Sequence, residues 1–175
     1  MINLIEGLSF DPNRQLLVTL DIVSLYTNIP QNESIDIIRN TLDNRETPHK
    51  VPTDFIVDLL TIALKDNYFK YDGQFYQQCS GTSMGAIFAP NLANIYVDHF
   101  ECEFVYSDAN PFKSSIVHWK RFIDDIFMVW QNTEGALHEF ISYLHRVQDH
   151  LKFTVHYSNM EITFLDLNIR HENGL

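Results

Sequence analysis

Several features are scarce in this chain of 175 residues, and each scarcity excludes a class of protein. With only 6 glycines, 6 prolines and 45% apolar residues, the chain is neither collagen-like nor disordered. Its 2 cysteines have no zinc-ligand spacing, which predicts reduced thiols in an intracellular protein rather than a metal site or a disulfide framework. No apolar run approaches the roughly 18 residues of a membrane-spanning helix, and the N-terminus has no signal-peptide pattern. The composition predicts a soluble globular protein.

Basic residues are scarce as well. The chain has 12 Lys and Arg against 23 Asp and Glu, a formal net charge of -11. Proteins that grip a phosphate backbone usually present a basic surface. If this protein binds nucleic acid, another part of the assembly must supply the positive charge.

The hydrophobic pattern predicts alternating strands and helices. The expected elements are a buried strand at 15–20 that ends at Asp21, helices at 33–44 and 53–65, a hairpin at 68–76 turning at Asp72-Gly73, a helix at 89–105, a hairpin at 116–130 with Asp124-Asp125 at or beside its turn, a helix from Thr133 to about Asp149, and a last hairpin at 153–169 turning at Ser158-Asn159. The second helix has its apolar residues at Phe55, Ile56, Leu59, Leu60 and Ile62. This order predicts one α+β domain over residues 15–175 after a lead-in segment 1–14, with an antiparallel-rich sheet and helices on one face.

The adjacent carboxylates Asp124 and Asp125 interrupt an apolar stretch. Two like charges near a core repel and are costly to desolvate unless a cation neutralises them, and Mg²⁺ prefers carboxylate oxygens. A solvated acidic turn between two strands is the ordinary alternative for such a pair.

A third carboxylate, Asp21, follows the first buried strand, where a strand-end cap is the alternative reading. If that strand lies beside the Asp124-Asp125 hairpin, three carboxylates converge. Such a set can hold two Mg²⁺ ions about 3.5–4 Å apart, the arrangement used for phosphoryl transfer.

The glycine-rich segment from Gly81 to Gly85 precedes a helix that opens at Pro90. Glycines let the backbone approach a ligand closely, although a plain turn before a helix has the same composition. The segment also satisfies G-x-S-x-G, the nucleophile elbow of serine hydrolases, with Ser83 as the nucleophile. The predicted antiparallel hairpins argue against that fold, because an elbow needs parallel βα repeats.

Four blocks of this sequence resemble the palm of a reverse transcriptase, most closely the Penelope-like retroelement type. They are LLVTLDIVSLYTNIP around Asp21, GTSMGAIFAPNLANIYV from Gly81 to Val97, RFIDDIF around Asp124-Asp125, and ITFLDLNI near the C-terminus. The blocks occur in the family's order and cover nearly the whole chain. The resemblance implies a palm with a split βαβ, ferredoxin-like sheet and RNA-directed DNA polymerase activity.

The resemblance also implies roles near the metals. Asp21, Asp124 and Asp125 would bind two Mg²⁺ ions, or Mn²⁺, with Asp21 and Asp124 as the direct ligands and the Ile22 carbonyl as a further one. Lys152 would protonate the pyrophosphate leaving group, and its alternative is a solvated lysine at the start of a strand.

On the nucleotide side, the resemblance places the Tyr26 ring under the sugar, where it would clash with a 2′-hydroxyl. The remaining residues that would contact a dNTP are Ser24, Met84, Gly85, Pro90 and Asn94. Met84 and the Phe122-Ile123 pair depart from the commonest reverse transcriptase pattern, and Met84 agrees with the Penelope-like one.

The expected partners are an RNA template, a DNA primer and dNTPs, with no membrane. The family's basic fingers residues precede the Asp21 block and its thumb follows the last hairpin, so we expect fingers and thumb to be largely absent here. We expect an intracellular protein, nuclear if it belongs to an active retroelement. A catalytically silent palm relic or binding module is the alternative, and a serine hydrolase using Ser83 is a third.

Overall fold

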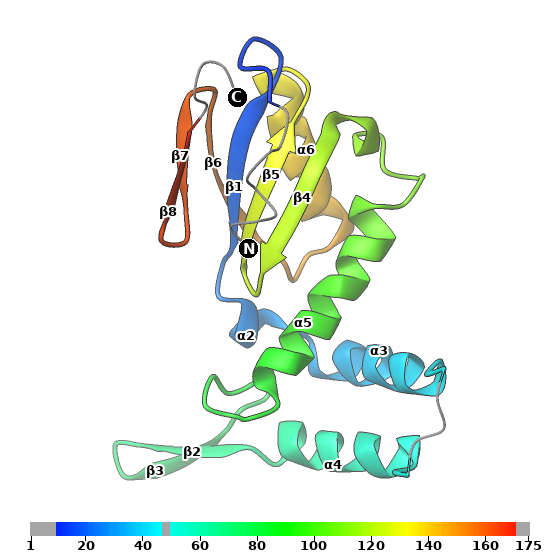
Figure 1. Ribbon diagram of the computed structural model, residues 1–175. Helices are drawn as coiled ribbons and strands as arrows, with labels where there is room; N and C mark the ends of the chain where they lie inside the picture. The colour runs from blue at the N-terminus through cyan, green and yellow to red at the C-terminus, as the bar shows by residue number, and fades with distance from the viewer. Residues whose placement is uncertain (1–9, 47–49, 171–175) are drawn as a thin grey trace. The chain divides into compact units, whose positions relative to one another are not determined.

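The structure is a computed structural model that describes residues 10–46 and 50–170 (Figure 1). Its residues form two compact units. One contains the described residues of Met1–Val23 and of Tyr106–Leu175, and the other contains those of Ser24–Val105. Most of the predicted lead-in segment 1–14 lies outside the described residues, so the boundary at residue 15 stays a prediction.

A four-stranded antiparallel sheet forms the first unit. Its strand order is β4-β5-β1-β6, with β1 at Leu16–Ile22, β4 at Ile116–Phe122, β5 at Asp125–Trp130 and β6 at Phe153–Ser158. The first strand of the chain thus lies between the third and the fourth of this sheet, which is the split βαβ arrangement expected from the sequence. The α+β fold is confirmed.

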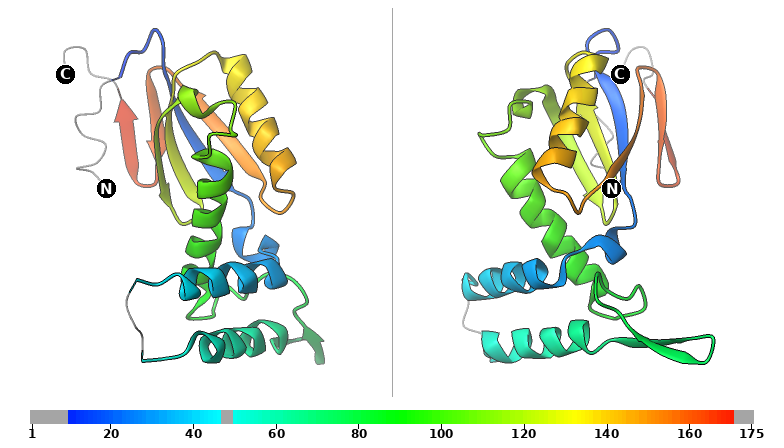
Figure 2. Two further views of the ribbon diagram at one scale, coloured as in Figure 1. Left: turned by 90° about the vertical axis from the view of Figure 1, so that its right-hand side faces the viewer. Right: turned by 180° about the vertical axis from the view of Figure 1, so that it is seen from behind.

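Both faces of this sheet are covered (Figures 1 and 2). Helix α6, Glu134–Val147, packs on one face, where the rings of Trp130 and Phe140 stack with centroids 5.3 Å apart. On the other face, Phe164, in the hairpin formed by Glu161–Phe164 and Leu167–Arg170, packs with Leu17 and Phe127. Burial on both sides explains why β1 and β5 are apolar at nearly every position.

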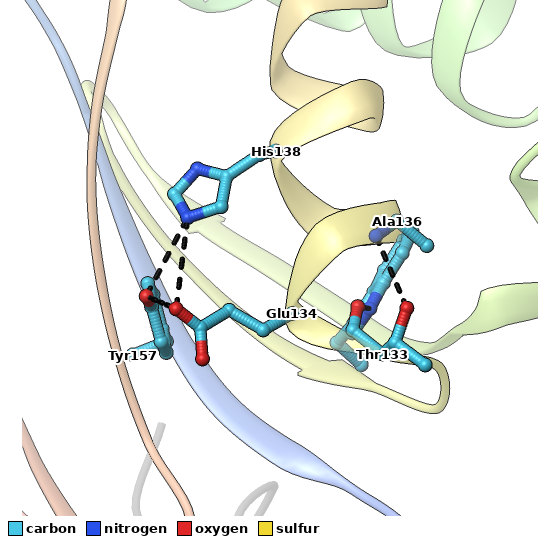
Figure 3. Close-up of polar contacts among 6 residues, drawn as sticks. Thr133, Glu134, Ala136, His138 and Tyr157 are labelled. Carbon is cyan, nitrogen blue, oxygen red and sulfur yellow. Dashed lines mark hydrogen bonds and ion pairs between the residues drawn. The ribbon is translucent and has the colours of Figure 1, made fainter.

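Local contacts secure the start of α6 (Figure 3). The Thr133 hydroxyl accepts a hydrogen bond from the Ala136 N–H at 3.2 Å, the N-cap expected from the sequence. Glu134 accepts a hydrogen bond from the Tyr157 hydroxyl of β6, and His138 lies 3.4 Å from the same hydroxyl. The bond to Glu134 raises the pKa of Tyr157. These contacts join α6 to the edge strand of the sheet.

The predicted pairing of the last hairpin is wrong. Strand β6 pairs with β1, and the segment expected as one strand divides into β7, Glu161–Phe164, and β8, Leu167–Arg170, which pair with each other. The chain reverses at Leu165, whose φ of 53° is left-handed. Leu165 is not a residue that usually adopts positive φ, and Asp166 beside it is the one ordinary turn former there, so the compositional signal for this turn is weak.

The second unit contains the other helices and one hairpin. Its elements are α2 at Leu25–Asn28, α3 at Gln31–Asp43, α4 at Thr53–Lys65, β2 at Tyr68–Tyr71, β3 at Gln74–Gln77, α5 at Ala89–Phe100 and the π-helical η1 at Glu101–Val105. The predicted elements are confirmed, although α3 begins two residues early and the predicted helix at 89–105 ends as η1. Ile38, Leu64 and Leu92 form the shared core of α3, α4 and α5.

Helix α4 buries a different side from the one its composition suggests. Its Phe55, Leu59 and Ile62 side chains are 57%, 52% and 57% exposed, whereas Val57 and Leu64 are buried.

Both cysteines are free thiols. Among the described residues, no helix is long and apolar enough to cross a bilayer.

Candidate active site

The three candidate aspartates lie at one end of the sheet of the first unit. Asp21, the penultimate residue of β1, faces Asp125, the first residue of β5, in the antiparallel ladder. The Ile22 N–H donates to the Asp124 carbonyl at 3.0 Å. The strand that carries Asp21 therefore lies beside the hairpin that carries Asp124 and Asp125, as predicted, and backbone hydrogen bonds join the two.

A tight turn presents the acidic pair. Ile123 has a φ of 56°, and the chain reverses there between β4 and β5. The guanidinium of Arg121, near the end of β4, donates to the Ile123 carbonyl at 3.1 Å and so stabilises the turn. A β-branched residue with positive φ is uncommon and costs free energy, so the surrounding ladder and this hydrogen bond must hold the conformation.

The carboxylates interact electrostatically. Burial, and then the charge of Asp124, raise the pKa of Asp21. Burial, followed by the charges of Asp124 and Asp21, likewise raises the pKa of Asp125. Desolvation and the neighbouring negative charges both disfavour the ionised forms, and a bound cation would favour them.

The donor chemistry of this set suits a hard divalent cation, because it consists of carboxylate oxygens. The side chains are not gathered into a cage, however. Across residues 10–46 and 50–170, no group of three or more His, Cys, Asp or Glu side chains is arranged so that it could hold a metal ion. The assignment of Asp21, Ile22, Asp124 and Asp125 as metal ligands stays a prediction.

Lys152 begins the segment that leads into β6. Its carbonyl accepts a hydrogen bond from the Val23 N–H at 2.8 Å, which places its backbone just beyond the end of β1. Its ammonium donates to the His145 carbonyl at 3.4 Å, near the C-terminus of α6. A lysine is favourable at that position because the last carbonyls of a helix carry partial negative charge. This contact suits the solvated-lysine alternative, and the catalytic role stays a prediction.

His145 also secures the start of β6. Its Nε2 accepts a hydrogen bond from the Phe153 N–H at 2.9 Å, and the two rings stack 5.9 Å apart. Burial and the charge of Lys152 lower the pKa of His145. Sequence reasoning misses this residue, because only the fold brings the helix end to the strand.

In the second unit, Tyr26 lies in the short helix α2, which begins after Ser24 in a left-handed conformation with φ 52°. The Tyr26 side chain is half-buried. Its carbonyl accepts a hydrogen bond from the Thr82 N–H at 2.7 Å. The structure therefore brings together the backbone of Tyr26 and the glycine-rich segment, two of the blocks singled out in the sequence.

The glycine-rich segment is tightly packed at its start and open further along. A Cβ on Gly81 would lie 2.5 Å from the Tyr26 carbonyl oxygen, whereas one on Gly85 would meet nothing within 4 Å. Met84 is 71% exposed, and Asn94 is exposed on α5, which opens with Pro90 in its first turn. Their roles in nucleotide binding stay predictions.

The serine hydrolase alternative gains no support from this geometry. Every strand pair in the described part of the chain is antiparallel, whereas a nucleophile elbow follows a strand of a parallel sheet. Among the described residues, no hydrogen bond joins the Ser83 hydroxyl to a histidine or a carboxylate.

Comparison with known proteins identifies the family. The model of the family described as reverse transcriptase (RNA-dependent DNA polymerase) matches residues 4–163. The chain belongs to the reverse transcriptase family. No curated protein matches this member of the family in sequence.

Solved structures share the fold of this reverse transcriptase chain. Apo telomerase from Candida tropicalis matches with a TM-score of 0.70 at 12% identity, over 90% of this chain and 31% of the telomerase chain. Telomerase from Candida albicans in complex with a TWJ fragment of telomeric RNA matches with a TM-score of 0.67 at 11% identity, over 90% and 29%.

The BmCPV RNA-dependent RNA polymerase at its elongation state matches with a TM-score of 0.55 at 15% identity, over 90% of this chain and 16% of the polymerase. The chain thus spans less than a third of each of these three structures.

Proposed function

We propose that this chain is the palm of an RNA-directed DNA polymerase from a retroelement, of the Penelope-like type, which adds dNTPs to a primer 3′-hydroxyl. The observation that carries the proposal is the register of β1 and β5, with Asp21 opposite Asp125 and the Ile22 N–H bound to the Asp124 carbonyl, in a chain of the reverse transcriptase family. Three interacting carboxylates at the end of a sheet are what metal-assisted nucleotidyl transfer needs.

In the proposed reaction, the primer 3′-hydroxyl loses its proton to solvent water and its oxygen forms a bond to the α-phosphorus of the dNTP. The bond from that phosphorus to the pyrophosphate oxygen breaks. Lys152 gives its ammonium proton to the departing pyrophosphate. Asp21 and Asp124 would hold two divalent cations, with Asp125 and the Ile22 carbonyl as additional ligands. Those ions, Mg²⁺ or Mn²⁺, would supply the positive charge that such a transition state requires.

On the nucleotide side, we propose that Tyr26 lies under the sugar and disfavours ribonucleotides. The other proposed contacts to the dNTP are Ser24, Met84, Gly85, Pro90 and Asn94. The exposure of Met84 supports this assignment, because a long apolar side chain in open solvent is available to a ligand.

The proposed template is RNA and the proposed primer is DNA. The Candida albicans telomerase that shares this fold is in complex with a fragment of telomeric RNA, which supports an RNA partner here. The net charge of -11 opposes binding of a polyanion, so we propose that fingers and thumb regions supply the basic surface.

Primer extension by the protein expressed from its complete reading frame tests the proposal. The parent protein should incorporate dNTPs on an RNA template with a DNA primer, and Asp124→Asn should lower the rate by at least about a hundredfold because it removes a proposed metal ligand. Asp36→Asn, an exposed change of equal charge on α3, is the matched control.

Two results would contradict the polymerase. Template binding without any extension, under Mg²⁺ or Mn²⁺, would favour the silent palm or binding module. Labelling of the protein by a fluorophosphonate, lost in Ser83→Ala, would favour the hydrolase.

A further inference from the structure

The side chain of Gln31, the first residue of α3, contacts three separate segments of the second unit. Its side-chain Nε2 lies 3.1 Å from the Leu64 carbonyl at the end of α4, 3.3 Å from the Gln78 carbonyl after β3, and 3.0 Å from the Gly81 carbonyl. All three partners are acceptors, so the amide must present its NH₂ group to them. Two N–H donors are therefore shared among three carbonyls.

These carbonyls need a partner from outside their own segments. The Leu64 carbonyl belongs to the last turn of α4, where a helix leaves its final carbonyls without intrahelical donors. The Gln78 and Gly81 carbonyls lie in the irregular chain between β3 and α5. One half-buried side chain thus donates to carbonyl groups of three separate segments.

The backbone at Gly81, which Gln31 contacts, also packs against the backbone at Tyr26 and Thr27. Gly81 has a φ of 67°, and a Cβ there would lie 2.6 Å from both the carbonyl carbon and the Cα of Thr27. The next residue, Thr82, donates its N–H to the Tyr26 carbonyl at 2.7 Å. Gly81 and Thr82 are therefore held between the Gln31 amide on one side and the Tyr26-Thr27 backbone on the other.

The side chain of Thr82 does not explain this placement. Thr82 is 2% exposed, and its hydroxyl has no hydrogen-bond partner among the described residues. A buried hydroxyl without a partner opposes the observed conformation. Backbone contacts, the fit of Gly81 and the Gln31 amide must hold the segment in place.

We propose that Gln31 is a positioning residue that fixes the loop Gly81–Gly85 against Tyr26 and thereby sets both dNTP affinity and the choice between deoxyribose and ribose. The inference rests on the proposed function, in which Tyr26, Met84 and Gly85 contact the nucleotide. Gln31 acts on them through the Gly81 carbonyl and the Thr82 bond to Tyr26, without touching the substrate.

Two substitutions test this role. Gln31→Met keeps a similar volume and removes both donors, whereas Gln31→Glu keeps the shape and turns a carboxylate toward three carbonyl oxygens. In single-nucleotide incorporation, each should raise the dNTP KM by about fivefold or more and move the rNTP/dNTP ratio of kcat/KM toward ribose by a similar factor. The kcat should change less than about threefold, because a displaced loop weakens binding before it alters the chemistry.

Asn32→Leu is the matched control, because Asn32 is the exposed neighbour of Gln31 in the same helical turn. It should leave both the KM and the sugar ratio unchanged. Thermal unfolding of every variant identifies a general loss of stability, and Gln31→Asn, whose shorter amide keeps its polarity, replaces any variant that does not fold.

Hydrogen exchange of the Thr82 amide provides a readout that needs no activity. Loss of the Gln31 donors should speed that exchange by about tenfold or more, because the bond to the Tyr26 carbonyl opens more often. Unchanged exchange at Thr82 would overturn the positioning role. The positioning role would also be overturned if the Gln31 variants unfolded at lower temperatures but kept the KM and the sugar ratio of the parent protein. A parent protein without Asp124-dependent extension would instead refute the proposed function, and with it the nucleotide-selecting part of this inference.

Discussion

Replacing Asp21 by Asn measures the repulsion among the candidate metal ligands. Residues opposite each other in antiparallel strands have Cβ atoms about 4.5–5.5 Å apart, and Asp21 lies opposite Asp125. Two like charges about 6 Å apart repel by about 0.7 kcal/mol at the dielectric constant of water and by about 3 kcal/mol at an effective value of about 20. Although partial burial raises its pKa, the Asp21 side chain is largely exposed to solvent, so screening favours the lower figure.

Without divalent cations at pH 7, we therefore expect Asp21→Asn to raise the free energy of unfolding by about 0.5–1 kcal/mol. For a chain of this length, the unfolding midpoint should rise by about 1–4 °C. Thermal unfolding followed by circular dichroism in EDTA measures both quantities. The gain has the opposite sign from that of most substitutions, which destabilise.

The stabilisation should also depend on pH. Burial and Asp124 raise the pKa of Asp21 above its ordinary value of 3.8, so the folded state holds the proton more tightly than the unfolded state does. Ionisation of Asp21 therefore begins to cost stability as the pH rises above 3.8, and the cost is complete above the raised pKa. The difference between the variant and the parent should be full at neutral pH and disappear below 3.8.

Mg²⁺ should reverse the order of stability. At a tenfold excess over its dissociation constant, a ligand adds about 1.4 kcal/mol to the free energy of unfolding of the parent. The Asp21→Asn variant should gain less, because it lacks a direct ligand. The exposed substitution Asp36→Asn changes the net charge equally and should gain as much as the parent does.

Two outcomes would refute this reasoning. One is a loss of stability in EDTA for Asp21→Asn relative to Asp36→Asn. The other is an equal Mg²⁺ stabilisation of the parent and the Asp21 variant, which would exclude Asp21 as a ligand.

Three other substitutions test separate parts of the structure. Tyr26→Ala should raise rNTP use relative to dNTP use by about 10–100-fold in single-nucleotide incorporation, since removing a steric contact is worth about 1–3 kcal/mol. Gly81→Ala should lower the free energy of unfolding in urea by more than about 2 kcal/mol, because the new Cβ would meet backbone 2.5 Å away at a φ of 67°. Burial and Lys152 lower the pKa of His145, so its contribution to stability is full above 6.5 and is lost as the pH falls through the lowered value. His145→Gln should flatten this pH dependence in thermal unfolding, because an amide oxygen can accept the Phe153 N–H without titrating.

Matched controls separate these effects from general damage. Tyr68→Ala removes an exposed tyrosine and should leave the sugar ratio unchanged, whereas an unchanged ratio in Tyr26→Ala would make Tyr26 an ordinary packed aromatic. Gly73→Ala meets no atom within 4 Å at a φ of 79° and should cost only about 1 kcal/mol, so equal losses at both glycines would contradict the packing argument. Parallel pH curves for the parent and His145→Gln would remove His145 as the titrating group.

Local chemistry made several features of this fold predictable. The hairpin at Asp72-Gly73 follows from a pair of residues that tolerates positive φ, and both adopt it, at 47° and 79°. Thr133 was expected to cap a helix, and it does. The acidic pair was expected at a turn because it interrupts an apolar run. Each inference needed only neighbours within a few positions along the chain.

Other features could not be predicted in this way. The turn at Leu165 has only Asp166 as a turn-forming residue, a weaker signal than Ser158-Asn159, and the last hairpin was assigned to the wrong strands. The apolar residues of α4 suggested a buried face, whereas Phe55 is exposed and Val57 is buried. Which side of a helix is covered depends on the elements that pack against it, and composition alone does not specify them.

The sequence by itself determined the types of most elements, the family and the positions of the candidate catalytic motifs. Only the tertiary structure decided that β6 pairs with β1 and not with the segment that follows it, and that Gln31 contacts carbonyls 33, 47 and 50 residues further along the chain. Periodicity and turn chemistry are properties of short segments and are therefore visible in the order of residues. Strand pairing and a side chain shared by three segments exist only after distant parts of the chain have closed around a common core.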